Sequence, residues 1–139
     1  MPRTITMAVH LPCSAHRLYR MYLDPKLHAA FTGAPVKIAA RAGAAFEAFG
    51  GAISGTILQI VPNRLIVQSW RSTQFYRRDL DSTLVLSFWP EGDGGRIELT
   101  HVNVADSDFA GASEGWTKYY WTPWREYLSR SSKKAADSD

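Results

Sequence analysis

Two stretches of alternating polar and apolar residues, followed by one aromatic amphipathic stretch, constrain the fold of this chain most strongly. Residues 46–71 and 82–102 alternate with a period of two, which is the pattern of half-buried β-strands. Residues 113–128, SEGWTKYYWTPWREYL, place their aromatic and aliphatic side chains at helical spacing. This order predicts an antiparallel sheet folded around one long C-terminal helix, with a pocket between the two.

Turn residues divide the alternating stretches into separate strands. Pro62-Asn63 and the glycine-rich segment 91–95 are turn signals, because proline fixes φ and glycine adopts positive φ at little cost. The expected strands cover residues 4–10, 44–49, 53–61, 65–71, 81–89 and 96–103. Their spacing is typical of a meander of antiparallel strands.

Two short helices are expected after the first strand. Ser14 stands where an N-cap belongs, and apolar residues follow it at helical spacing. Asp24 and Pro25 form a second start, with aspartate at the N-cap and proline at the first helical position, and Gly33 ends that helix. Residues 34–43 fit either a loop or an edge strand, since they contain a proline and a glycine.

The C-terminal helix predicted over 113–128 contains Pro123, which lacks a backbone N–H and clashes with the preceding turn. Either the helix bends at this residue or it begins later. Beyond Leu128 the residues are polar. We therefore expect a single domain over 1–130 and a flexible polar tail over 131–139.

Composition excludes several classes of protein. The chain has 139 residues and a net charge of +3, and its basic residues are scattered, whereas nucleic-acid binding requires a dense basic patch. The longest apolar runs are too short to span a membrane. Cys13 is the one cysteine, so an intrachain disulfide is impossible, and the N-terminus has no signal-peptide core. We expect a cytoplasmic protein.

Catalytic and metal-binding motifs are missing from the sequence. The four histidines show no metal-ligand spacing. Cys13 and His16 lie near a helix start, but no orienting group or oxyanion site accompanies them, as a nucleophilic pair requires. The glycines at 92–95 belong to a hairpin and do not form a phosphate loop. We therefore expect no metal, no cofactor and no catalytic residue.

A family likeness is spread along the chain in a characteristic order. It is carried by FEAFGG at 46–51 with Gly55, PNRLIVQSWR at 62–71, GGRIELTH at 94–101, Gly115-Trp116 and Tyr120-Trp121. In this order the segments resemble the START-like (SRPBCC) helix-grip superfamily. Within it, the chain is most similar to the family of activator of heat-shock-protein-90 ATPase homologues. The likeness spans residues 5–128.

The resemblance implies an α+β helix-grip fold. In this fold a curved antiparallel sheet wraps around a long C-terminal helix, and two short helices follow the first strand. Members of the superfamily usually hold an apolar ligand between the sheet and the long helix. The family takes its name from a eukaryotic co-chaperone that stimulates the chaperone's ATPase, so a co-chaperone-type interaction module is the alternative that the resemblance implies.

Strand parity and helical spacing select the side chains that face this pocket. Residues two apart on a strand share a face, as Gln68 and Trp70 do. The candidate lining residues are Phe49, Gln68, Trp70, Leu86, Phe88, His101, Trp116, Tyr119 and Tyr120. They predict an aromatic-walled ligand cavity, or, if they pack against one another, a solid core.

Gln68 and His101 are the polar members of this set. A buried amide or imidazole needs a hydrogen-bond partner, which is either a ligand or a backbone group, a tyrosine hydroxyl or water. The leading hypothesis is a monomeric or homodimeric protein that binds an apolar small molecule. The alternative is a co-chaperone module with a chaperone partner. A pocket-based hydrolase or cyclase ranks last, because no acid–base pair is evident.

Overall fold

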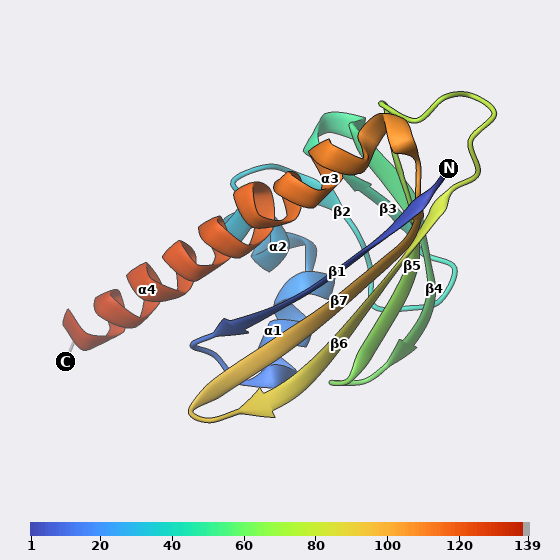
Figure 1. The fold of residues 1–139 in the computed structure, drawn as a ribbon. Helices are drawn as coiled ribbons and strands as arrows, with labels where there is room; N and C mark the ends of the chain where they lie inside the picture. Colours follow the sequence, from blue (N-terminus) through green and yellow to red (C-terminus); the bar gives the residue numbers. More distant parts are fainter. Residues whose placement is uncertain (138–139) are drawn as a thin grey trace.

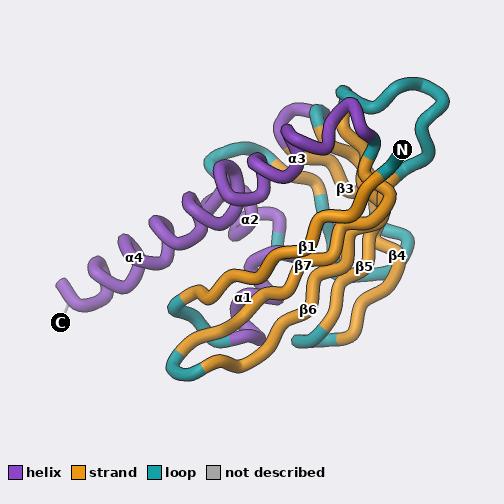
Figure 2. Tube along the Cα trace, in the orientation of Figure 1, coloured by secondary structure: helices purple, strands orange, loops and turns teal. Residues whose placement is uncertain are grey.

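The computed structural model, which describes residues 1–137, contains a curved seven-stranded antiparallel sheet with every helix on one face (Figures 1 and 2). The strand order is β1-β7-β6-β5-β4-β3-β2. The strands are β1 Arg3–Leu11, β2 Val36–Lys37, β3 Ala45–Ala48, β4 Ile53–Val61, β5 Leu65–Ser72, β6 Ser82–Glu91 and β7 Gly94–Val104. The predicted α+β helix-grip architecture is confirmed, and the ambiguous segment 34–43 contributes the short edge strand β2.

Close backbone contact between neighbouring strands accompanies the curvature of the sheet. β4 carries a register shift between Ile57 and Gln59 in its pairing with β5, which is a bulge that bends the strand. Gly55 in β4 lies against Ser69 in β5, and a Cβ atom at Gly55 would sit only 1.9 Å from the Ser69 carbonyl oxygen. A residue with a side chain cannot occupy this position without moving the strands.

The two short helices begin and end close to the predicted residues. α1 spans Ala15–Leu23 and α2 spans Pro25–Thr32. Asp24 caps α2 by accepting hydrogen bonds from two backbone amides of its first turn, and Gly33 ends α2 in the left-handed conformation, with φ 78°. Ser14 occupies the N-cap position of α1, but its side chain makes no capping hydrogen bond.

The C-terminal helical segment starts earlier and continues further than expected. It consists of the 3₁₀ turn η2 Asp106–Asp108, α3 Phe109–Gly115, the π-helical turn η3 Trp116–Trp121 and α4 Thr122–Asp137. The predicted flexibility of the tail 131–139 stays a prediction, since α4 runs through most of the tail and its last two residues lie outside the described chain.

The π-helical turn explains how Pro123 is tolerated inside this segment. The backbone N–H of Thr122 bonds to the carbonyl of Thr117, five residues back, so the helix is widened just before the proline. A proline in a regular α-helix removes the bond to the fourth residue back and its ring clashes with that carbonyl. Of the two alternatives that Pro123 leaves open, a later helix start does not occur, because helical structure precedes the proline and continues through it after a local change of helical pitch.

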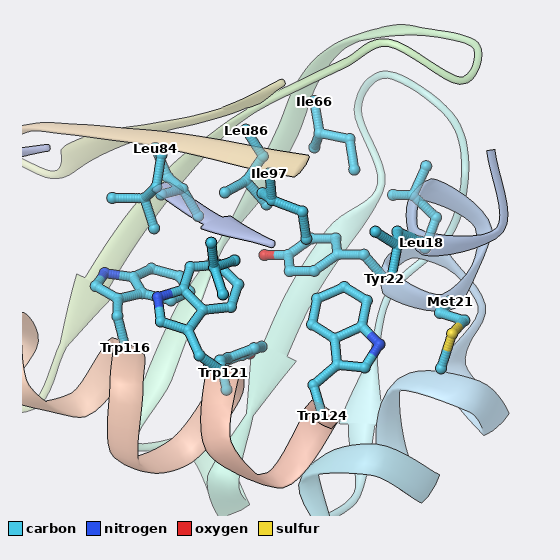
Figure 3. Packing of buried hydrophobic residues seen from close by; sticks show 14 of the residues in the cluster. Leu18, Met21, Tyr22, Ile66, Leu84, Leu86, Ile97, Trp116, Trp121 and Trp124 are labelled. Atoms are coloured by element: carbon cyan, nitrogen blue, oxygen red, sulfur yellow. The ribbon is translucent and has the colours of Figure 1, made fainter. Parts of the chain in front are cut away.

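Indole rings from the C-terminal segment fill the centre of the molecule. Figure 3 shows Trp116, Trp121 and Trp124 projecting from the helix toward aliphatic side chains of the sheet. Trp124 is fully buried and stacks on Phe31 of α2, with ring centroids 4.1 Å apart. Side chains thus close the middle of the space between sheet and helix, where the sequence allowed either a cavity or a solid core.

One polar network crosses this core around His28. The Tyr22 hydroxyl donates to Oε1 of Gln68, at 2.5 Å. His28 Nδ1 lies 2.7 Å from the Tyr22 carbonyl, and its Nε2 lies 2.9 Å from the Tyr120 hydroxyl. A carbonyl oxygen only accepts, so Nδ1 carries a hydrogen. Burial lowers the pKa of His28 to about 4, so the imidazole is neutral at pH 7 and its Nε2 accepts from the Tyr120 hydroxyl.

A second network surrounds His101 on β7. The Ser82 hydroxyl donates to the carbonyl of Trp70 at 2.5 Å, so it accepts from Nε2 of His101 at 2.8 Å. Nδ1 of His101 then accepts from the indole N–H of Trp116, at 3.2 Å. Burial in these apolar surroundings lowers the pKa of both His28 and His101 to about 4.

The two buried histidines predict a loss of stability in mild acid. Each imidazole takes up its proton near pH 6.5 in the unfolded chain but near pH 4 in the folded one, so the unfolded state binds more protons between these values. Stability is complete above about pH 6.5 and is lost as pH falls toward 4. We expect the free energy of unfolding to be about 3–4 kcal/mol smaller at pH 5 than at pH 7.

Urea unfolding at pH 7, 6 and 5 measures this dependence. The variants His28→Gln and His101→Gln each remove one of the two groups, so each is expected to show about half of the wild-type change between pH 7 and pH 5. An unfolding free energy that is equal at pH 5 and pH 7 in the wild type, or an unaltered change in both variants, would contradict the assignment.

Candidate functional site

A cavity of about 360 Å³ lies at one end of the space between sheet and helix. Its floor comes from the ends of β4 and β5, one side from the turn η1 (Phe49–Gly51), and its roof from α3 and η3, which cross this end of the sheet in Figure 1. Its lining residues are Phe49, Ala52, Ile53, Trp70, Ser72, Thr73, Gln74, Asp108, Gly111, Ala112, Glu114, Gly115, Trp116, Lys118, Tyr119 and Tyr120.

Aromatic rings form most of the wall. Trp116 lies 4.9 Å from Tyr120 and 6.4 Å from Trp70, measured between ring centroids. Phe49 faces them from η1, at 5.7 Å from Tyr119 and 6.0 Å from Tyr120. Tyr119 is half exposed and stands at the mouth, whereas Trp70, Trp116 and Tyr120 are buried. Such a wall offers π-faces and apolar edges to a flat ligand.

Phe49 is held at the cavity wall by an unusual backbone conformation. Its φ is 54°, in the left-handed region that bulky residues rarely adopt, and Gly50 and Gly51 follow with φ of 67° and 91°. A left-handed residue of this kind costs on the order of 1–3 kcal/mol and persists where the surroundings hold it. The turn η1 thus keeps a strained conformation that places the Phe49 ring over the cavity.

The π-helical turn η3 sets the opposite wall. In an α-helix, residues three and four apart share a face. A π-helical turn contains about one more residue, so a residue five positions along the chain lies on that face as well. Trp116 and Trp121 accordingly stack at 5.8 Å with an angle of 24° between their planes. Trp116 and Tyr120 line the cavity, while Trp121 packs into the core beside them.

The Tyr120 ring is held in place by a hydrogen bond on the side away from the cavity. Its hydroxyl points away from the cavity and donates to Nε2 of His28. Burial raises the pKa of Tyr120, so the phenol stays protonated and keeps its role as donor. The ring that lines the cavity is therefore anchored by the same network that links Tyr22 and Gln68.

The polar side of the cavity lies where β5 meets α3. The Ser72 hydroxyl donates to Oδ2 of Asp108, at 2.7 Å. Glu114 and Lys118 follow on the helical roof, and the Lys118 ammonium lies 5.3 Å from the centroid of the Tyr119 ring. The site thus combines an apolar aromatic body with a few charged groups at one side, which is the usual composition of small-molecule sites.

The predicted lining residues divide into two groups. Phe49, Trp70, Trp116, Tyr119 and Tyr120 lie together around the cavity. The others do not line it: Gln68 and His101 belong to the buried networks, and Leu86 and Phe88 pack in the core, where Phe88 meets Tyr19 of α1 edge-on at 5.6 Å.

Ser72, Asp108 and Gly111 line the cavity but were absent from the predicted set. Strand parity carries no information on them, since Ser72 ends β5 and the others lie in the turn and helix that follow β7. The Asp-Ser-Asp sequence at 106–108 is typical of a helix start, but this pattern does not indicate that Asp108 lines the cavity.

A second depression of about 590 Å³ lies beside α1. Charged and small side chains such as Arg20, Asp24 and Ala40 contribute to its edge, so it lacks the aromatic wall of the first cavity. Among the described residues, no three His, Cys, Asp or Glu side chains are grouped as metal ligands. No helix in the described part of the chain is both long and apolar enough to cross a membrane.

Comparison with known proteins identifies a family model and relatives that share one description. The family model described as "Activator of Hsp90 ATPase homolog 1-like protein" matches residues 12–129. Human activator of 90 kDa heat shock protein ATPase homolog 1 is 27% identical, covering 84% of this chain and 34% of that protein. The Dictyostelium discoideum homologue is 24% identical, covering 94% and 34%. The chain thus spans about a third of these relatives' length.

Solved structures share the fold at low sequence identity. An HSP90 activator from Plasmodium falciparum superposes with a TM-score of 0.83 at 19% identity, covering 91% of this chain and 96% of that chain. The Aha1 dimer from Colwellia psychrerythraea superposes with a TM-score of 0.72 at 13% identity, covering 86% and 91%. Because the family model covers most of the sequence, the chain belongs to the family of Activator of Hsp90 ATPase homolog 1-like proteins.

Proposed function

We propose that this chain is a small-molecule-binding domain that takes an apolar, aromatic or lipid-like ligand into the cavity under α3 and η3. The observation that carries the proposal is the aromatic wall, in which Phe49, Trp70, Trp116, Tyr119 and Tyr120 surround a space of about 360 Å³. Ligand sites typically measure about 300–1,000 Å³ and combine apolar walls with few polar groups.

Two further features support a binding role for this cavity. Backbone strain concentrates at functional sites, and Phe49 keeps a left-handed conformation at the cavity wall. In addition, side chains fill the centre of the space between the sheet and the C-terminal helical segment, and the cavity lies at the end of this space that they leave open.

The buried histidines favour binding over catalysis at this site. A general base needs a nitrogen that can reach the substrate. Both nitrogens of His28 and both nitrogens of His101 are already engaged by groups of the protein. These residues therefore serve to orient the wall, and the proposed role of the cavity is to hold a ligand.

Filling the cavity is expected to abolish binding. Ala52 lines the cavity from the turn after η1 and has ordinary helical dihedral angles, so Ala52→Phe adds a ring inside the space without requiring a strained backbone. We expect the affinity for N-phenyl-1-naphthylamine, an uncharged fluorescent apolar probe, to fall at least about tenfold, because the added ring occupies the volume that the probe needs. Fluorescence titration measures the effect.

The matched control is Ala40→Phe, which places the same ring in the second depression. We expect this variant to bind the probe as the wild type does, with both variants melting within a few degrees of it. Wild-type affinity in Ala52→Phe, or loss of binding in Ala40→Phe alone, would place the probe outside the proposed cavity and contradict the assignment.

A second candidate function is a co-chaperone-type interaction. The relatives named as activators of the 90 kDa heat shock protein ATPase favour it, since they align with 84% and 94% of this chain. The loop between β5 and β6 is a candidate contact, because Tyr76 and Leu80 are 63% and 78% exposed there. Arg71 holds this loop by donating to the carbonyls of Tyr76 and Asp79.

Purified 90 kDa heat-shock protein from the same host tests this candidate. If the loop is the contact, the chain binds the chaperone at low salt and raises its ATPase rate, and the double variant Tyr76→Ser/Leu80→Ser reduces both, because the apolar contact is lost. The control is Leu58→Ser/Val61→Ser, which changes two exposed apolar residues of β4. Absence of binding by the wild type, or an equal loss in the control, would rule out this contact.

A further inference from the structure

Asp108 is a largely buried carboxylate that forms no ion pair with any described basic side chain. It is 9% exposed and stands at the start of α3. Its Oδ2 accepts from the Ser72 hydroxyl, at 2.7 Å, and this is its one side-chain hydrogen bond among the described residues. The other acids that the structure pairs, such as Asp106 with Arg3, have an arginine or an amino group as partner. A buried charge ordinarily needs such a counter-charge.

Oδ1 of Asp108, which makes no hydrogen bond among the described residues, lies against Gly111 of α3. Gly111 lies one turn along α3, and a Cβ atom at this position would sit 2.9 Å from Oδ1 of Asp108. Both residues line the aromatic cavity. A side chain at position 111 would therefore crowd Oδ1, and glycine avoids this contact.

The described side chains that line the cavity carry a net negative charge. The lining contains the acids Asp108 and Glu114 and the single basic residue Lys118, which gives two negative charges against one positive. Lys118 is exposed, and its ammonium stands over the Tyr119 ring, 5.3 Å from the centroid. The net charge of this lining is thus opposite in sign to the +3 of the chain as a whole.

We propose that the ligand of this cavity carries a protonated amine on an apolar or aromatic body; this deepens the proposed binding function and rests on it. The amine lies next to Oδ1 of Asp108 and supplies a counter-charge that no described side chain provides there. The body lies among the rings of Trp70, Trp116 and Tyr119. Aromatic faces attract cations electrostatically, so the rings and the carboxylate select the same class of ligand.

Three matched probes separate charge from shape. They are 4-phenylbutylamine, 4-phenylbutanol and 4-phenylbutanoate, which share one apolar body and are positive, neutral and negative at pH 7. Titrations followed by tryptophan fluorescence and by amide NMR shifts are expected to give an affinity for the amine at least about tenfold higher than for the carboxylate. In the variant Asp108→Asn this preference is expected to fall below about threefold, since the shape is kept and the charge removed.

Two further variants control for structural effects. Asp106→Asn removes the same charge from the same turn but outside the cavity, and it is expected to keep the amine preference. Gly111→Ala keeps the carboxylate and places a methyl group against Oδ1, so it is expected to weaken the amine about tenfold and the alcohol much less. This second variant remains informative if Asp108→Asn folds poorly.

The outcomes distinguish this inference from the binding function itself. If the alcohol or the carboxylate binds in the cavity as tightly as the amine, or if Asp108→Asn keeps the amine preference, the binding function stands and the amine assignment is wrong. If none of the probes, including N-phenyl-1-naphthylamine, shifts the amides of the cavity residues, both the binding function and the amine assignment are wrong.

Discussion

The hydrogen bonds of His28 hold the helices of this domain in register with the sheet. The imidazole of α2 bonds to the Tyr22 carbonyl of α1 and to the Tyr120 hydroxyl of η3, while the Tyr22 hydroxyl reaches Gln68 on β5. One neutral side chain thus connects three helical elements, and through Tyr22 it connects them to the centre of the sheet. Removing a partner from such a buried network leaves polar groups unsatisfied, which costs about 1–3 kcal/mol for each group.

The same network marks the inner boundary of the cavity. Behind Tyr120 the interior is closed, because Trp124 stacks on Phe31 and leaves no room between α2 and α4. In front of Tyr120 the roof changes from π-helix to the short helix α3, and small residues such as Ala112 and Gly115 leave the space open. The anchored tyrosine is therefore the boundary between the core and the proposed binding cavity.

Periodicity predicted much of this arrangement, and its limits have physical reasons. The strands of the meander and the capped helix at Asp24 follow from local patterns that the tertiary structure keeps. Parity also identified the inward face of β5, but it could not tell that Gln68 is enclosed by Tyr22 whereas Trp70 reaches the cavity. That difference depends on where the helices cross the sheet, and a pattern along one strand contains no such information.

The C-terminal segment shows a second limit. Pro123 was correctly recognised as incompatible with a regular α-helix, but the sequence does not indicate that a π-helical turn before it resolves the conflict. The sequence does not identify Asp108 as a cavity residue for a related reason. Its position in the cavity wall depends on its packing against Ser72, which is 36 residues away in the chain. Local sequence therefore predicts helices and strands well. It predicts the residues that line the cavity only where a regular helix or strand contributes them.

We infer that this domain holds a small molecule in the aromatic cavity, and native mass spectrometry of the protein purified from its own host is the decisive test of this claim. We expect a stoichiometric adduct whose mass identifies the ligand. The same ligand is expected to raise the melting temperature, because binding to the native state alone stabilises it. A spectrum that contains only the mass of the unliganded chain, recorded under conditions that preserve complexes of known apolar-ligand carriers, would contradict the claim.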